Sequence, residues 1–145
     1  MSEAEILYRV EDGIGWLTLN RPQARNALTF AMYEEIAKIT GDIAGHGNPR
    51  VLILTGAGDK AFAAGTDISQ FRAFSTPEDA ITYEGRIERI LTTIEACPIP
   101  TIAAISGAVT GGGAAIAAVC DLRIATHTAR FGFPIARTLG NCLSI

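Results

Sequence analysis

The stretch that decides the fold is SGAVTGGGAAIAAVCD, residues 106–121. It places Gly111, Gly112 and Gly113 directly before a run of alanine, isoleucine and valine. Because alanine is the best helix former, the run predicts a buried helix that begins at the glycines. A helix start presents unpaired N–H groups and the positive end of the helix dipole. Glycine lets a ligand approach these groups closely, so we predict a binding site in front of the helix.

A second loop with glycines follows another buried strand. VLILTGAGDKAFAAGTDIS, residues 51–69, starts with a continuous apolar run that is typical of a strand buried on both faces. Two such loops favour a site in which two backbone N–H groups stabilise an oxyanion. Tight turns that serve packing alone are one alternative. A dinucleotide site is another, because GAGDKA fits the loose pattern G-x-G-x-x-A, but no acidic residue ends a second strand about 20 residues on.

Strands and helices alternate along the chain. ILYRVED and GIGWLTLN are rich in β-formers and predict a hairpin around Asp12-Gly13. PTIAAISG, residues 100–107, and DLRIAT, residues 121–126, predict two further strands. The alternation predicts an α/β fold with a mostly parallel sheet, in a single domain over residues 1–145.

Two more helices are marked by their start signals. Thr29 is the expected N-cap of a helix that carries Tyr33 on its apolar face and ends at Gly45. Thr76 caps a second helix, over residues 77–96, which begins with proline and two acids. Both helices have apolar residues at helical spacing, so each is expected to have one apolar face.

Composition limits the partners of the protein. The chain is 48% hydrophobic with a net charge of −3, and its twelve lysines and arginines are scattered, which argues against nucleic acid. Three cysteines without CxxC spacing and an acidic N-terminus predict reduced thiols in a cytoplasmic protein. Residues 99–120 carry no charge and are long enough to span a bilayer. Proline and adjacent glycines interrupt that segment, so we expect no membrane helix.

Four segments resemble the enoyl-CoA hydratase/isomerase (crotonase) family in their order and spacing. They are LNRPQARNAL, VLILTGAGDKAFAAGTDI, PTIAAISGAVTGGGAAIAAVCDLRIAT and ARFGFP. The resemblance implies a crotonase-like spiral of ββα units that binds an acyl-CoA thioester. It implies no cofactor other than the coenzyme A that is part of the substrate. No metal site is expected either, because the sequence has no metal-ligand spacing.

The resemblance also assigns roles to individual residues. The backbone N–H groups of Thr66 and Gly112 would form an oxyanion hole that stabilises a thioester enolate. The residues implied in substrate binding are Arg25, which would meet the nucleotide or pantetheine part, and Ala64, Asp67 and Ile68, which would line the channel. Asp67 also stands at a predicted helix start, where a capping role suits it better. Arg137 is either an anchor for an anionic substrate group or a surface arginine.

The chain departs from the family at two catalytic positions. Hydratases of the family carry glutamates where this chain has Ala115 and Ile135. Those acids perform the general acid–base chemistry, so ordinary hydration is not expected and the proton carrier is unassigned. Two hypotheses follow: an acyl-CoA lyase or isomerase, and a non-catalytic acyl-CoA-binding or assembly protein. A titratable side chain close to Thr66 and Gly112 would favour the enzyme.

Family members normally continue past the length of this chain, into a C-terminal helical region that closes the acyl pocket and builds trimers. We therefore expect this region to be absent from the 145 residues, and the full-length form to be a homo-oligomer, a trimer or hexamer. The 145-residue chain on its own is expected to be inactive and prone to associate, because apolar faces would stay uncovered.

Overall fold

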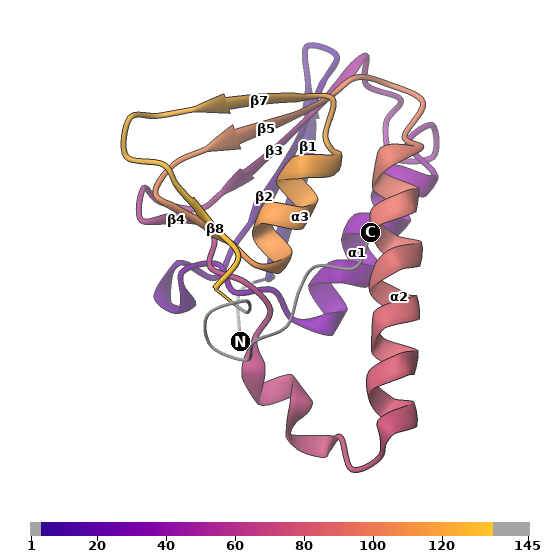
Figure 1. The fold of residues 1–145 in the computed structure, drawn as a ribbon. Helices are drawn as coiled ribbons and strands as arrows, with labels where there is room; N and C mark the ends of the chain where they lie inside the picture. The colour runs from indigo at the N-terminus through magenta and orange to yellow at the C-terminus, as the bar shows by residue number, and fades with distance from the viewer. Residues whose placement is uncertain (1–3, 135–145) are drawn as a thin grey trace.

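The computed structural model describes residues 4–134, which form two sheets and three α-helices (Figure 1). In chain order the elements are β1 (Ile6–Glu11), β2 (Ile14–Leu19), the 3-10 helix η1 (Pro22–Ala24), α1 (Phe30–Gly41), β3 (Val51–Gly56), β4 (Ala61–Ala63), the 3-10 helix η2 (Ile68–Ala73), α2 (Pro77–Glu95), β5 (Thr101–Ile105), β6 (Ala108–Thr110), α3 (Gly112–Val119), β7 (Leu122–Ala125) and β8 (Arg130–Gly132).

The larger sheet is mostly parallel, as the alternation of elements predicts. Its strand order is β1-β2-β3-β5-β7, and β1–β2 is its antiparallel pair. The smaller sheet, β4-β6-β8, is parallel throughout. The pairs β3/β4, β5/β6 and β7/β8 each give their first strand to the larger sheet and their second to the smaller one, and α2 and α3 follow the first two pairs. This repetition confirms the spiral of ββα units.

The hairpin prediction is confirmed at its turn. Ile6 faces Leu19 at one end of the β1–β2 ladder, and Glu11 faces Ile14 at the other. Between the strands, Asp12 and the following glycine both have positive φ, 53° and 78°. Two adjacent residues in this region suit the right-handed twist of the two strands, which explains the Asp-Gly pair.

Helix α1 starts where predicted and ends earlier. Thr29 caps it and accepts a hydrogen bond from the backbone N–H three residues on. The helix ends at Gly41 rather than at Gly45, and the Asp42 N–H donates to the Lys38 carbonyl as its last bond. The Asp42 carboxylate then accepts from the Gly45 N–H at 3.1 Å. A local side-chain bond of this kind offers the backbone a turn in place of another helical turn.

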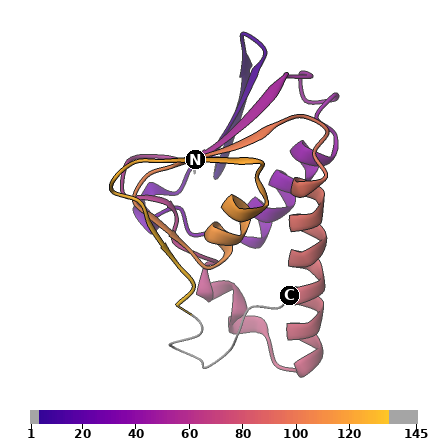
Figure 2. The same cartoon turned by 45° about the horizontal axis from the view of Figure 1, so that its top comes forward.

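Helix α2 confirms its sequence prediction closely. Thr76 caps it, and the Asp79 carboxylate accepts hydrogen bonds from the N–H groups of Ser75 and Thr76. Ile90 and Ile94 are fully buried and carry its apolar face. The helix packs beside α1 and α3, and both views show it along one side of the molecule (Figures 1 and 2).

The three-residue strands β4, β6 and β8 were not predicted. They create the second sheet, and α3 packs between this sheet and α2. Residues 99–120, which were long enough to be considered for a membrane span, form β5, β6 and α3 instead. Within residues 4–134, no helix is both long and apolar enough to cross a membrane.

Candidate active site

The two loops with glycines meet directly. Gly65 has a φ of 110° and Gly111 a φ of 52°, a region that few other residues adopt. A Cβ built on Gly111 would lie 3.6 Å from the Gly65 Cα. The contact brings the next residue of each loop together, because a Cβ on Gly112 would lie 3.0 Å from Thr66 Oγ1. The two residues implied as oxyanion donors are therefore neighbours.

A third loop holds the first one in place. The Ala64 N–H donates to the Arg25 carbonyl at 3.0 Å. The Leu28 N–H donates to the Gly65 carbonyl, and the residue 67 N–H donates back to the Leu28 carbonyl, both at 2.8 Å. This bridge uses the groups on either side of Thr66 and leaves the Thr66 N–H pointing away from the third loop.

The amides of Thr66 and Gly112 are both available to a ligand. Gly112 is the first residue of α3, where backbone N–H groups have no partner within the helix. Gly111 before it has no side chain that could cap them. Among residues 4–134, neither the Thr66 N–H nor the Gly112 N–H donates a hydrogen bond to the protein.

Protein atoms fill the space beside two of the three glycines. A Cβ on Gly113 would overlap the Ala63 carbonyl, so α3 packs directly against β4. A Cβ on Gly112 would overlap the Tyr33 hydroxyl. The sequence interpretation, in which the missing Cβ admits a ligand, therefore needs correction at Gly112. There the space is used by Tyr33, while the Gly112 N–H has no hydrogen-bond partner among residues 4–134.

A chain of three hydroxyls adjoins the amide pair. Tyr33 Oη lies 2.8 Å from Thr66 Oγ1, which lies 3.2 Å from Tyr83 Oη. Tyr33 comes from α1 and is 1% exposed, whereas Tyr83 comes from α2 and is half-buried. Burial raises the pKa of both phenols, so both are protonated at neutral pH. Sequence reasoning placed Tyr33 in the core and did not single out Tyr83, because nothing in the sequence links these residues to Thr66.

An aromatic cluster holds the Tyr83 ring. Its members are Phe30, Phe71, Phe74 and Tyr83 itself. The Tyr83 ring centroid lies 5.4 Å from that of Phe30, 4.8 Å from Phe71 and 6.0 Å from Phe74. Tilted and edge-to-face pairs of this spacing are favourable for aromatic rings. The cluster fixes the ring, and so directs its hydroxyl toward Thr66.

Asp67 has the capping role that its position predicts. Its carboxylate accepts from the Ser69 N–H at 3.0 Å and the Ser69 hydroxyl at 2.7 Å, and caps η2. It also pairs with Arg21 at 3.0 Å. The Ser69 hydrogen bonds, followed by that of Arg21, hold the pKa of Asp67 below its ordinary value. Beside it, Ile68 is 83% exposed. Contact of either residue with substrate stays a prediction.

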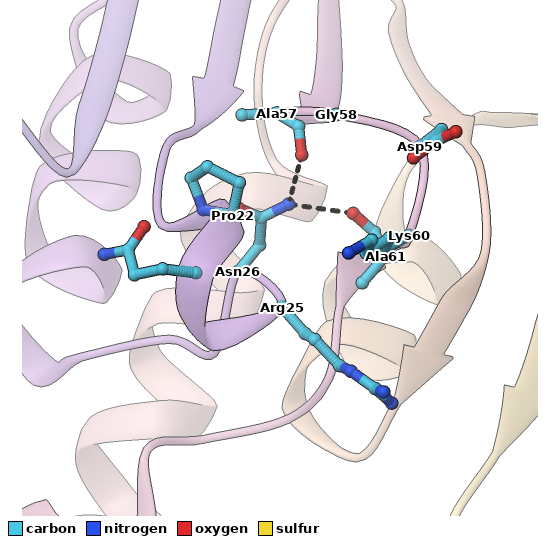
Figure 3. A pocket seen from close by; sticks show the side chains of 9 residues that line it. Pro22, Arg25, Asn26, Ala57, Gly58, Asp59, Lys60 and Ala61 are labelled. Atoms are coloured by element: carbon cyan, nitrogen blue, oxygen red, sulfur yellow. Dashed lines mark hydrogen bonds between the residues drawn. The ribbon is translucent and has the colours of Figure 1, made fainter.

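Arg25 lines a pocket of about 310 Å³ (Figure 3). The lining residues are Pro22, Gln23, Arg25, Asn26, Ala57, Gly58, Asp59, Lys60 and Ala61. The buried Asn26 side chain braces the wall by donating to the carbonyls of Ala57 and Ala61, at 3.0 and 2.8 Å (Figure 3). Arg25 and Lys60 bring two positive charges to the pocket, against one negative charge from Asp59.

The secondary structure around the segment GAGDKA excludes the dinucleotide site that its glycine pattern suggested. The segment GAGDKA runs from β3 into β4, so it joins a strand to a strand. A dinucleotide fingerprint needs a helix directly after the glycines, because the pyrophosphate binds at the helix N-terminus. The dinucleotide interpretation of this segment is therefore wrong.

The position of the missing glutamate lies beside the amide pair. Ala115 is half-buried and follows Gly112 by one turn of α3, so the two residues share a helix face. Ile135 and Arg137 lie outside the described residues. Over residues 4–134, no group of three or more His, Cys, Asp or Glu side chains is arranged to hold a metal ion.

Comparison with known proteins identifies the family. The sequence model described as Enoyl-CoA hydratase/isomerase matches residues 9–140. The chain belongs to the enoyl-CoA hydratase/isomerase family. The chain is similar to the Bacillus subtilis protein YngF, with 42% identity over 130 residues. It is also similar to the short-chain-enoyl-CoA hydratase of Clostridium acetobutylicum, with 37% identity over 134 residues. Each match covers 89% of this chain, and 50% and 49% of the respective relative.

Solved structures confirm the crotonase-type fold. The chain is similar to an enoyl-CoA hydratase/carnithine racemase from Magnetospirillum magneticum, with a TM-score of 0.89 and 37% identity. That match covers 99% of this chain and 54% of the other. The chain thus spans about half the length of the relatives it matches.

Proposed function

We propose that the full-length protein acts on an acyl-CoA thioester and stabilises its enolate with the N–H groups of Thr66 and Gly112. The observation that carries the proposal is the meeting of two loops that leaves these two amides side by side, without a partner among residues 4–134. Paired donors aimed at a developing negative charge lower the barrier because they need no reorganisation. Removal of one such donor typically costs about 10²–10³ in rate.

The pocket around Arg25 and Lys60 supports coenzyme A as the carrier of the acyl group. Phosphate groups are suited to this pair of cations. Thr66 follows Ala61 by five residues, a separation of at most roughly 17 Å along the chain, so the pocket and the amide pair lie within reach of one extended ligand. We propose that Arg25 meets the nucleotide or pantetheine part, and that Ala64, Asp67 and Ile68 line the path to the amides.

An enzyme is favoured over a non-catalytic binding protein. The hydroxyls of Tyr33 and Tyr83 are titratable groups in contact with Thr66, which is the observation expected of an enzyme. Relatives named short-chain-enoyl-CoA hydratase and crotonyl-CoA hydratase point the same way. We propose a lyase or isomerase reaction of the enoyl-CoA hydratase/isomerase type, other than ordinary hydration of an enoyl-CoA, with no cofactor beyond the coenzyme A of the substrate.

Assembly and location belong to the same proposal. Apolar side chains of the last two strands are exposed, with Leu122, Ile124 and Phe131 between 55% and 64% exposed. Such a surface suits burial against further protein, and we propose a homo-oligomer for the full-length form. Cys97 and Cys120 are unpaired thiols, which supports a cytoplasmic location.

A turnover screen tests this proposal. The full-length protein is incubated with a panel of saturated, unsaturated and hydroxylated acyl-CoA thioesters, and the products are identified by mass spectrometry. We expect at least one thioester to be converted, and a folded Gly112→Val variant to convert none. Absence of both binding and conversion across the panel, or an unchanged rate in the variant, would contradict the proposal.

A further inference from the structure

The three hydroxyls beside the amide pair have a defined direction. Tyr33 is 1% exposed, and its hydroxyl contacts one hydrogen-bond partner among residues 4–134, Thr66 Oγ1. If Tyr33 only accepted a hydrogen bond, its O–H would be buried without an acceptor, which is strongly unfavourable. Tyr33 therefore donates to Thr66.

The direction continues from Thr66 to Tyr83. The Thr66 hydroxyl carries one proton, and the Tyr83 oxygen, at 3.2 Å, is the remaining acceptor that the described residues offer it. The Thr66 O–H thus donates to Tyr83 Oη. Tyr83 Oη then has its own proton left to donate, and it makes no further hydrogen bond with residues 4–134.

The unused donor of Tyr83 faces the site from a fixed ring. The aromatic cluster packs the Tyr83 ring on several sides, so the hydroxyl is pre-positioned. It lies one hydroxyl away from Thr66, whose N–H is one of the two amide donors. The raised pKa of Tyr83 keeps the phenol protonated, which suits a hydrogen-bond donor rather than a base.

We infer that Tyr83 contacts the substrate and donates a hydrogen bond to an oxygen on the β-carbon of the acyl group. This inference rests on the proposed function. The thioester oxygen binds the Thr66 and Gly112 amides, and an oxygen on the β-carbon is only a few bonds away from it. Tyr83 therefore selects acyl thioesters that carry a β-oxygen over those with a plain alkyl chain. Tyr33 acts through Thr66 and is a positioning residue.

Calorimetric binding of two ligands tests the inference. Acetoacetyl-CoA carries an acceptor oxygen on its β-carbon and cannot lose water, whereas butyryl-CoA lacks that oxygen. We expect the full-length protein to bind acetoacetyl-CoA about twofold to tenfold more tightly than butyryl-CoA, as one hydrogen bond predicts. Tyr83→Phe keeps the ring in the aromatic cluster and should abolish this preference, while the affinity for butyryl-CoA stays unchanged.

Two further variants separate a contact from a structural effect. In Tyr33→Phe the Thr66 oxygen loses its donor and can accept a hydrogen bond from Tyr83 instead. The Tyr83 hydroxyl is then less available to the substrate, so the preference for acetoacetyl-CoA over butyryl-CoA should shrink. Tyr8→Phe removes a hydroxyl that donates to the His46 carbonyl, away from the site, and should keep the preference. A preference that persists in Tyr83→Phe, or an equal loss of affinity for both ligands, overturns the inference. If neither ligand binds the wild-type protein, the proposed function fails and the inference fails with it.

Discussion

The hydroxyl of Tyr33 occupies the position that a side chain on Gly112 would need. The buried Tyr33 thus brings helix α1 into contact with the first turn of α3, and it also bonds Thr66 at 2.8 Å. One contact joins the three segments that form the site: α1, the loop after β4 and the start of α3. The glycine at residue 112 is required by the protein's own packing as well as by access to its N–H.

Substitution at Gly112 should be destabilising in a way that Tyr33 controls. In Gly112→Ala the new methyl group overlaps Tyr33 Oη, and overpacking of this kind costs about 1–3 kcal/mol in the free energy of unfolding. Tyr33→Phe removes that oxygen and leaves Cζ at 3.2 Å from the new Cβ. The double variant should therefore be more stable than Gly112→Ala alone, as measured by urea unfolding.

Gly85→Ala is the matched control for Gly112→Ala, because it makes the same substitution in a helix where the new methyl group meets no other atom. Gly85 lies within α2, and a Cβ built on it meets nothing within 4 Å. Alanine there should stabilise the protein by about 0.5–1 kcal/mol, through helix propensity. If the changes in the free energy of unfolding caused by Gly112→Ala and Tyr33→Phe are strictly additive in the double variant, the overlap with Tyr33 Oη is not the reason that Gly112→Ala is destabilising.

Charge reversal at Arg25 should weaken the binding of coenzyme A thioesters. It should not affect thioesters that carry the same acyl group but lack the phosphates of coenzyme A. Arg25 is exposed at the pocket rim, so Arg25→Glu should lower acyl-CoA affinity by about fivefold at low salt, and by less at high salt. The N-acetylcysteamine thioester of the same acyl group lacks the phosphates and should bind the wild-type protein and the Arg25→Glu variant equally. Arg50→Glu, on the exposed Arg50 near the hairpin turn, makes the same change in charge and should have no effect. An equal loss for both ligands would place Arg25 at the acyl end.

Hydration of crotonyl-CoA should be very slow. Ala115 and Ile135 stand where carboxylates would each contribute about 10²–10⁴ to the rate. Because Ala115 shares a helix face with Gly112, Ala115→Glu should raise the rate of hydration, by up to about 10². Ala115→Gln has a side chain of similar size without the acid and should leave the rate unchanged. A wild-type rate equal to that of Ala115→Glu would show that another group already supplies the protons.

Asp67 should make stability depend on pH at the acidic end. The pKa of this carboxyl is lowered in the folded protein, so its contribution is complete above the ordinary aspartate pKa of about 3.9. The contribution is lost as the pH falls from there through the lowered value. Asp67→Asn keeps the cap but loses the charged hydrogen bonds, so at pH 7 it should cost about 1.5 kcal/mol.

Urea unfolding at a series of pH values measures the effect. The difference between wild type and Asp67→Asn should disappear at the lowest pH. Asp59→Asn is the control for removal of a carboxylate, because the Asp59 carboxylate in the wall of the Arg25 pocket makes no hydrogen bond within residues 4–134, and at pH 7 this variant should cost less stability than Asp67→Asn. A difference for Asp67→Asn that is equally large at pH 7 and at pH 2.5 would contradict this account.

Much of the fold can be predicted from local signals. The Asp-Gly turn, the caps at Thr29 and Thr76, and the apolar strands each carry a pattern long enough to identify. The strands β4, β6 and β8 have three residues each, too few for any periodicity to appear. The end of α1 was predicted at Gly45 because Gly41 lies within the helical spacing, whereas the helix ends at Gly41 and Asp42 starts a turn that bonds Gly45.

The site could be predicted only in part. The two glycine loops predict a site with paired N–H donors, because helix starts and glycines can be recognised in the sequence, and the family resemblance assigns the donors to Thr66 and Gly112. The meeting of Tyr33 and Tyr83 at Thr66 joins α1 and α2 to a loop, and it depends on how the helices pack. Local sequence carries no signal for such a contact. The proton carrier that the sequence leaves unassigned therefore has to be sought among side chains that tertiary packing brings in.

The most direct test of the central claim follows the two amides themselves. The full-length protein, labelled with ¹⁵N at glycine and threonine, is titrated with butyryl-CoA and, separately, with free coenzyme A, while ¹H–¹⁵N spectra are recorded. We predict that butyryl-CoA moves the amide protons of Thr66 and Gly112 downfield, because both donate to the thioester oxygen. Free coenzyme A should leave these two resonances nearly unchanged. Saturating butyryl-CoA that binds without shifting either resonance would contradict the assignment of Thr66 and Gly112 as the oxyanion donors.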